Sequence, residues 1–183
     1  FILQNHGTDK IYLVRKPGSQ ENNVEEHFRK INAPDGNPLL KIELVNINED
    51  FSVLKNKMDS NRISIIIGGS LNETFASSLA GYVQSISDIY PVTLIGMPNW
   101  DGFVSILNNK KLKDFPVYYT SPYYNTKWDI HSKKIKELYL KKYKGVPSDL
   151  TYKGFETAYQ FTNLITRFPT NLINHLNDYP FRI

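Results

Sequence analysis

Residues 62–78 read RISIIIGGSLNETFASS, and this stretch decides the fold. It contains a run of β-branched apolar residues, Ile63–Ile67, interrupted only by Ser64. Such a run is typical of a strand buried on both faces, as in a parallel sheet covered by helices. Gly68 and Gly69 end the run, and glycine lets the backbone turn sharply and leaves room for something to approach.

A helix is predicted directly after the two glycines. Ser70 stands three residues before Glu73, which is the spacing of a capping box, so we expect Ser70 to cap this helix. Apolar residues then recur at helical spacing, at Leu71, Phe75, Leu79, Tyr82, Val83 and Ile86. The stretch therefore predicts a strand, a glycine turn and a capped helix.

The same alternation runs through the chain. Apolar runs at 11–14, 39–45, 92–95 and 117–120 predict four more strands. We expect Ser19 to cap a helix with the buried stripe Val24, Phe28 and Ile31. Strands that alternate with helices favour parallel pairing through right-handed crossovers. We therefore predict an α/β fold, a Rossmann-like, doubly wound and mostly parallel five-stranded sheet in the order 2-1-3-4-5.

Two longer helices are predicted after the last strand. The first spans 129–143, with Ile135, Leu138 and Tyr139 facing inward. The second begins at Asp149 or Thr151 and has an apolar stripe at Phe155, Ala158, Tyr159, Thr162 and Ile165. We expect a single α/β domain over residues 1–183, with a sheet lobe at 10–120 and a returning helical segment at 121–183.

Composition is that of an ordinary globular domain, 183 residues with 40% hydrophobic and 22% charged. The net charge of +4 is too small to indicate nucleic-acid binding. Between Lys110 and Lys144, however, the chain carries ten lysines and three acidic residues. A solvated helix face is the favoured interpretation, and a patch for phosphate or a membrane is the alternative.

The sequence contains no catalytic constellation, so we expect neither an enzyme nor a cofactor. It has no cysteine, and its four histidines have no metal-like partner at close spacing. A phospho-receiver domain would need a pair of acidic residues after the first strand. Arg15 and Lys16 stand at that place, which argues against such a domain. No run of about 18 apolar residues predicts a membrane span. The chain starts at Phe1 rather than Met, which leads us to expect a mature or excised segment.

Polar residues gather where the predicted strands end. In open α/β sheets, ligands bind beyond the carboxyl ends of the strands, and helix N-termini there favour a carboxylate or other anion. Asn46 and Tyr123 also fall in such turns. An alternative is that all of these are ordinary turn residues. The candidate ligand-binding residues are Ser19, Gln20, Gly68, Gly69, Ser70, Asn72, Met97, Asn99 and Trp100.

Four segments together resemble a known family. They are KIYLVRKPGSQENN (10–23), IIIGGSLNETFASSLAGYVQSI (65–86), VTLIGMPNWDG (92–102) and KIKELYLKKYKGVPSDLTYKGFETAYQF (134–161). They resemble the second lobe of type I periplasmic solute-binding proteins of the leucine/isoleucine/valine-binding group. In the family's GYDA-type helix, Phe155 and Glu156 stand here for Tyr and Asp. The pattern is similar to Bacteroidetes-type domains that follow LysM repeats, although these 183 residues contain neither a LysM repeat nor the family's first lobe.

This resemblance implies a non-enzymatic, solute-receptor-like domain, similar to the substrate-binding proteins of ABC transporters. The implied ligand is a small polar molecule such as an amino acid or peptide, and the implied location is the periplasm or the cell exterior. An alternative is a degenerate scaffold of the cell envelope that binds a protein or peptidoglycan and no small ligand. Because Phe155, Tyr159 and Phe161 carry much apolar area, we expect them to pack on the sheet or to form a homodimer.

Overall fold

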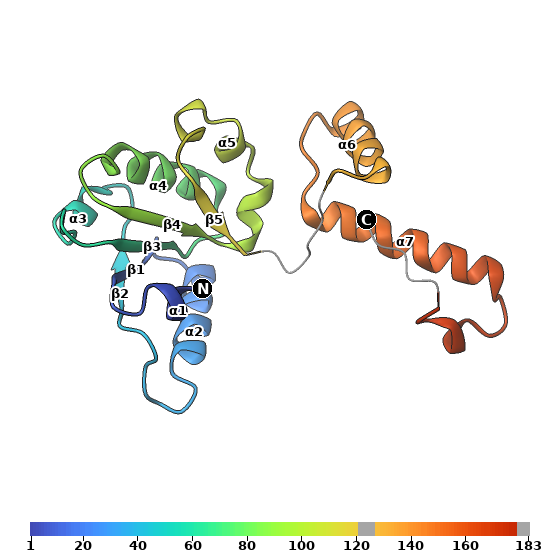
Figure 1. Ribbon diagram of the computed structural model, residues 1–183, viewed down its shortest axis with the longest axis horizontal. Coiled ribbons are helices and arrows are strands. Elements are labelled where there is room, and N and C mark those ends of the chain that lie inside the picture. The colour runs from blue at the N-terminus through green and yellow to red at the C-terminus, as the bar shows by residue number, and fades with distance from the viewer. Residues whose placement is uncertain (121–126, 179–183) are drawn as a thin grey trace. The chain divides into compact units, whose positions relative to one another are not determined.

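The computed structural model describes residues 1–120 and 127–178. Its contacts divide the chain into two compact units, residues 1–120 (unit 1) and residues 121–183 (unit 2). The division falls where the sequence analysis placed the change from sheet lobe to returning segment. Unit 1 contains the whole sheet, and the described part of unit 2 contains helices alone (Figure 1).

Unit 1 is built on a five-stranded sheet (Figure 1). All neighbouring strands pair in parallel, in the order β2-β1-β3-β4-β5. The predicted fold class and strand order are therefore confirmed. The strands are β1 (Lys10–Arg15), β2 (Ile42–Asn46), β3 (Ser64–Gly68), β4 (Val92–Gly96) and β5 (Val117–Tyr119). All five residues of the central strand β3 are buried.

Helices cover both faces of this sheet. Figure 1 shows α4 and α5 on one side and α1 and α2 on the other. The helices are α1 (Ile2–Asn5), α2 (Ser19–Asn32), α3 (Ser52–Lys55), α4 (Glu73–Ile86) and α5 (Val104–Leu107), with 3-10 turns η1 (Pro98–Gly102) and η2 (Lys110–Leu112). The unit is thus a three-layer α/β arrangement.

The two faces of the sheet bury cores of different size. Successive residues of a strand point to opposite faces, so Tyr12 and Val14 face the larger core while Ile11 and Leu13 face the smaller one. The larger core is filled from α4, where Phe75, Ala76, Leu79, Ala80 and Val83 are buried. The smaller core has four buried residues, with Phe28 of α2 packed against them. The α2 side of the sheet is therefore the more thinly covered one.

Both predicted serine caps are wrong. Helix α2 begins at Ser19 itself, its N-cap is Gly18, and no side chain caps it. Helix α4 is capped by Asn72, whose side chain accepts a hydrogen bond from the Phe75 N–H at 2.9 Å. The Ser70 hydroxyl bonds elsewhere, as the next section describes.

The second strand is shorter than predicted at its start. It begins at Ile42, because the preceding segment is tied to the end of α2 instead of to the sheet. Leu39 N–H donates to the Asn32 carbonyl, and the Asn32 side chain exchanges two hydrogen bonds with the Leu40 backbone. Asn32 at the end of α2 therefore determines where β2 begins, whereas the apolar pattern predicted a start for this strand that was too early.

The described part of unit 2 consists of α6 (Ile130–Tyr143), α7 (Asp149–Arg167) and the 3-10 turn η3 (Leu172–His175). Asp129 caps α6 through hydrogen bonds from the N–H groups of His131 and Ser132. The N-cap of α7 is Ser148, rather than Asp149 or Thr151. Among residues 1–120 and 127–178, none of the helices has both the length and the apolar character of a membrane span.

The apolar side chains of unit 2 are mostly exposed. On α6, Ile135 is buried as predicted, but Leu138 is exposed. On α7, Tyr152 and Leu164 are buried, so the predicted stripe is not the buried one. Phe155, Ala158, Tyr159, Thr162 and Ile165 are all exposed. The rings of Phe155 and Tyr159 stack on each other at 6.0 Å between centroids. Self-association through this stripe stays a prediction.

Candidate functional site

The predicted site lies at the carboxyl edge of the sheet in unit 1, where β1, β3 and β4 end. Some of its residues are buried here, namely Gly68, Gly69, Ser70 and Trp100. Others are exposed or half-buried, namely Ser19, Gln20, Asn72, Met97 and Asn99. The two groups have different roles. Tyr123, which also belonged to the predicted edge, lies outside the described residues.

Trp100 fills the space that the glycines leave. Its side chain is 1% exposed, and its Nε1–H donates to the Ser70 carbonyl at 2.9 Å. A Cβ atom on Gly68 or on Gly96 would collide with the indole ring, and a Cβ on Gly69 would collide with the Leu13 side chain. The prediction that the glycines admit a ligand and that Trp100 stacks on it is therefore wrong for this conformation, since the protein's own side chains occupy the space.

Ser70 is fully buried and belongs to an internal contact. Its hydroxyl donates to the Glu21 carboxylate at 2.7 Å and accepts from the Asn72 N–H at 3.2 Å. Glu21 is 4% exposed and lies in the first turn of α2, where the helix dipole favours a negative charge. The carboxylate expected from a ligand at this helix end is thus supplied by the chain itself.

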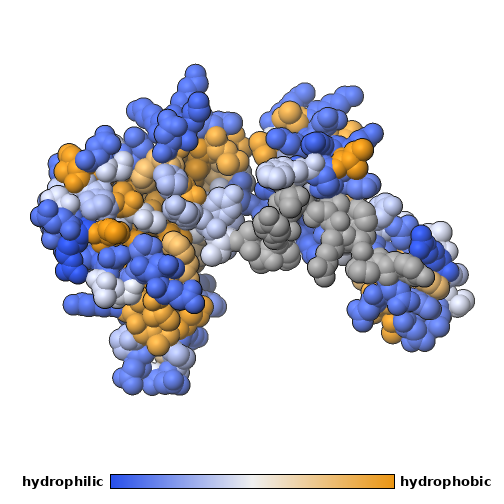
Figure 2. Space-filling view, viewed as in Figure 1, coloured by the Kyte–Doolittle hydropathy of each residue, from blue (hydrophilic) through white to orange (hydrophobic). Residues whose placement is uncertain are grey.

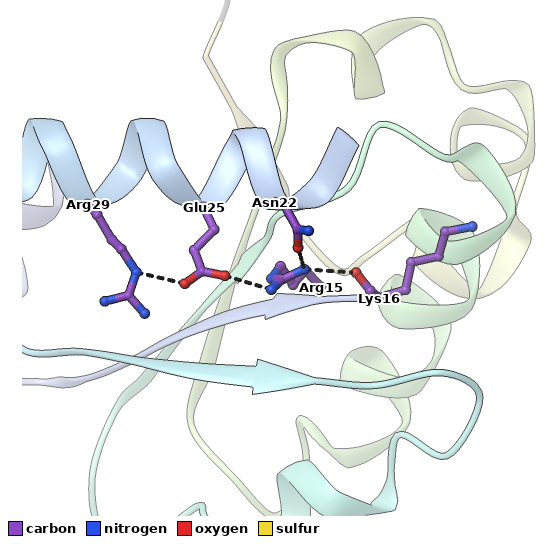
Figure 3. Close-up of polar contacts among 5 residues, drawn as sticks. All are labelled: Arg15, Lys16, Asn22, Glu25 and Arg29. Atoms are coloured by element: carbon purple, nitrogen blue, oxygen red, sulfur yellow. Dashed lines mark hydrogen bonds and ion pairs between the residues drawn. The ribbon is translucent and has the colours of Figure 1, made fainter. Parts of the chain in front are cut away.

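A second polar network ties β1 to α2 (Figure 3). Arg15, the last residue of β1, is 8% exposed, and its guanidinium lies between strand and helix. It pairs with the Glu25 carboxylate at 2.7 Å and donates to the Asn22 side chain at 2.8 Å. Glu25 also accepts from Arg29 at 2.7 Å. The hydrogen bond from Arg29, helped by the charge of Arg15, holds the pKa of Glu25 below its usual value.

Sequence analysis missed this network. The spacing of Glu25 and Arg29 is the i, i+4 arrangement of a helical ion pair, and that signal was available. Nothing local marks Arg15 as their buried partner, because a strand-end arginine is ordinarily exposed. The network joins β1 to α2 and pairs its charges, although the buried Nε–H of Arg15 has no hydrogen-bond partner among the described residues.

The open feature of the edge is a groove beside α2, with a volume of about 450 Å³. We call it the α2 groove. One side is the helix face that includes Val24, Phe28 and Ile31, and the other side is Leu71 after β3 and Met97 after β4. Gln20, Asn23 and His27 complete the lining. The predicted buried stripe of α2 is thus half-open, with Ile31 exposed and Val24 and Phe28 partly buried.

The α2 groove brings together two of the predicted site residues, Gln20 and Met97. Ser19, Asn72 and Asn99 lie at the same edge but do not line it. Asn99 donates instead to the Leu71 carbonyl at 3.2 Å. The lining residues Asn23, His27 and Leu71 were missed, although the helical spacing of Val24, Phe28 and Ile31 pointed to this helix face.

Two other cavities of similar size are also present. One, of about 450 Å³, runs between α2 and β2, and its wall includes Glu25 and Arg29 of the ion-pair network. The other, of about 470 Å³, lies between η2 and β5, and its wall includes Lys110, Lys113 and the predicted site residue Trp100, which follows β4. Neither includes a residue from the turn after β3. Of these three cavities, the α2 groove is the candidate that joins the turns after β3 and β4, through Leu71 and Met97.

The side chains that line the α2 groove set its chemistry. Its lining is largely apolar, with two amides and one imidazole. The Nδ1 atom of His27 is hydrogen-bonded to the Asn23 carbonyl at 2.7 Å. Within residues 1–120 and 127–178, no group of three His, Cys, Asp or Glu side chains is placed to hold a metal ion.

Comparison with protein-family models, with curated protein sequences and with solved structures found no match to this chain.

Proposed function

We propose that unit 1 is a non-enzymatic ligand-binding domain that takes a small molecule at the carboxyl edge of its sheet. One observation carries the proposal, the α2 groove of about 450 Å³. Small-molecule sites are commonly concave and mostly apolar, with a few polar groups that orient the ligand. Gln20, Asn23 and His27 supply such groups here.

The lining favours a ligand with a polar end and an apolar body. Val24, Phe28, Leu71 and Met97 offer apolar contact, and the amides of Gln20 and Asn23 offer both donors and acceptors. An apolar amino acid or a short apolar peptide has this character. A solute-receptor role in the periplasm or outside the cell, which the family resemblance implies, belongs to the same proposal.

Binding is favoured over catalysis because of what lines the groove. Among the described residues, the lining has no Ser, Thr, Asp, Glu or Lys side chain, and so neither a hydroxyl nucleophile nor a carboxylate base. The nearby Ser70 and Glu21 are hydrogen-bonded to each other and buried. Of the described residues that line the groove, His27 is the one titratable group that a substrate would meet.

Titration of the ¹⁵N-labelled chain with amino acids and dipeptides, followed by NMR, tests the proposal. We expect an apolar ligand to shift the amide signals of Val24, Leu71 and Met97. A ligand at 100 times its Kd should also stabilise the protein by about 2.7 kcal/mol in thermal unfolding. If no apolar amino acid or dipeptide shifts these signals, the proposal is wrong.

A matched pair of variants locates the site. Leu71→Glu places a charge in the apolar wall of the groove and should weaken binding by at least about tenfold. Ile89→Glu changes another exposed apolar residue, which lies before β4 at the opposite edge of the sheet, and should leave binding unchanged. Equal loss in both variants would place the ligand elsewhere.

A scaffold without a small ligand is the second candidate, and a specific observation favours it. The polar groups at the centre of the edge are bonded to one another, Ser70 to Glu21 and Trp100 to the Ser70 carbonyl. Such a domain would bind an envelope protein or peptidoglycan through its surface. For this candidate we expect the protein to co-sediment with purified peptidoglycan, and we expect the titration with amino acids and dipeptides to shift no amide signal.

A further inference from the structure

Helix α6 carries a strong and uncompensated positive charge. Residues 133–144 contain six lysines and a single acid, Glu137. All six lysines are exposed, and among the described residues none of them forms an ion pair with an acidic side chain. A solvated helix of ordinary composition mixes both signs, so this excess needs a separate explanation.

Exposed apolar side chains lie among these lysines. Ile130, Lys134, Leu138 and Lys142 follow one another at four-residue spacing, which places them on one side of the helix, and Lys141 lies on the same side. Trp128, just before the helix, is 82% exposed. We call this set the α6 patch: Trp128, Ile130, Lys134, Leu138, Lys141 and Lys142. Figure 2 shows hydrophobic atoms scattered among hydrophilic ones over α6.

We propose that the α6 patch binds the surface of an anionic lipid bilayer. The lysines complement the negative headgroups, and their long apolar stems reach along the surface while the charges stay in water. Trp128, Ile130 and Leu138 enter the headgroup region, where tryptophan is especially favoured. This function is independent of the α2 groove, which lies in unit 1.

The apolar members of the patch favour a bilayer over a soluble polyanion. A soluble polyanion would contact the lysines alone. Trp128, Ile130 and Leu138 would then stay exposed to water and contribute nothing to the binding free energy. At a bilayer, these three side chains leave water when the lysines bind. Charge and apolar area on one helix face together are the mark of an interfacial helix.

Vesicle co-sedimentation of the full chain tests the proposal. We expect binding to vesicles of equal parts phosphatidylglycerol and phosphatidylcholine at about 0.1 M salt, and release at about 1 M salt. Vesicles of phosphatidylcholine alone should not bind. Binding to both kinds of vesicle, or to neither, would overturn the proposal.

Tryptophan fluorescence gives a second readout. The chain has two tryptophans, and Trp100 is buried, so Trp128 is the one that reports a change of surroundings at the surface. We expect its emission to shift to shorter wavelength with anionic vesicles. Trp128→Phe should abolish the shift while most of the binding remains. Heparin should leave the emission unchanged; an equal shift with heparin would show a general polyanion site instead.

Charge-reversal variants assign the surface. Lys134→Glu, Lys141→Glu and Lys142→Glu combined should weaken vesicle binding about 100-fold, since each lysine near an anionic surface contributes about a factor of five. The control reverses Lys110, Lys111 and Lys113, which changes the net charge equally in unit 1, and should alter binding less than about threefold.

A second variant, which replaces apolar residues of the α6 patch, tests the proposal even if charge reversal disturbs folding. Ile130→Ser with Leu138→Ser retains every lysine and changes two exposed side chains. We expect weaker vesicle binding and a smaller emission shift, with an unchanged circular dichroism spectrum. Unaltered binding by both the lysine triple variant and this double variant would exclude the α6 patch.

Discussion

The Trp100 ring packs closely against Gly68 and Gly96, and a single substitution can test this contact. Gly96→Ala places a methyl group against the buried indole ring, and neither can move without disturbing the larger core. We expect a loss of about 1–3 kcal/mol in the free energy of unfolding, measured by urea denaturation.

Gly81→Ala is the matched control for this substitution. Gly81 lies inside α4, and a Cβ there meets no atom within 4 Å. Because alanine is the better helix former, the variant should gain about 0.5–1 kcal/mol. If both variants changed stability in the same direction, the close contact between Gly96 and Trp100 would be in doubt.

The Glu25 carboxyl group should make the stability of the protein depend on pH in the acidic range. Its pKa is held below the usual value of 4.5, chiefly by the hydrogen bond from Arg29. A lowered folded-state pKa means that the stabilisation is complete above the unfolded-state pKa and disappears as the pH falls through the folded-state pKa. We expect the free energy of unfolding to fall below about pH 5, and to fall less steeply in Glu25→Gln.

The same variant should cost stability at neutral pH. Glu25→Gln leaves the buried Arg15 guanidinium without its carboxylate partner, and we expect a loss of about 2–3 kcal/mol at pH 7. Glu26→Gln is the control, since Glu26 pairs with Lys30 at the surface and its loss should leave the free energy of unfolding close to that of the parent. Urea titrations across the pH range measure both effects. Similar losses from both variants would mean that the Arg15 contact contributes little.

At the scale of elements, helix starts are set by contacts that the local sequence only partly reveals. Asn72→Ala removes the side chain that caps α4 and should cost about 1 kcal/mol. Ser19→Ala removes no cap, because the N-cap of α2 is Gly18 and no side chain caps the helix, and the variant should stay within about 0.5 kcal/mol of the parent. Denaturation of the two variants side by side decides between the observed caps and the predicted ones; a larger loss for Ser19→Ala would favour the prediction.

At the scale of the whole molecule, the two units differ in how much core they have. Unit 1 buries apolar residues on both faces of a sheet. Among its apolar side chains, the described part of unit 2 buries only Ile135, Pro147, Tyr152 and Leu164. Small chains with little buried apolar area are not stable by themselves.

We therefore expect the fragments to behave differently. Residues 1–120 should fold alone and unfold in urea in one cooperative transition. Residues 121–183 should show a shallow, non-cooperative loss of helical signal in the same experiment. A sharp transition for the second fragment would show that its helices need no other partner.

The sequence by itself determined the sheet, its parallel pairing and its strand order. Apolar runs such as Ile63–Ile67 and the helical stripes between them are local patterns, and they repeat at the periods of strand and helix. Alternation of the two then limits the topology to very few choices. Residues at the carboxyl edge could be placed for the same reason, because the ends of parallel strands meet at one edge.

Only the tertiary structure decided what those residues do there. The Ser70 hydroxyl reaches Glu21 across 49 positions of the chain, and the Trp100 indole reaches the Ser70 carbonyl across 30. No period or spacing encodes such contacts, since they depend on which side chain fills the space that another leaves. The close packing of Trp100 against Gly68 and Gly96 closes the expected site, and the thin cover on the α2 side of the sheet opens the groove beside it.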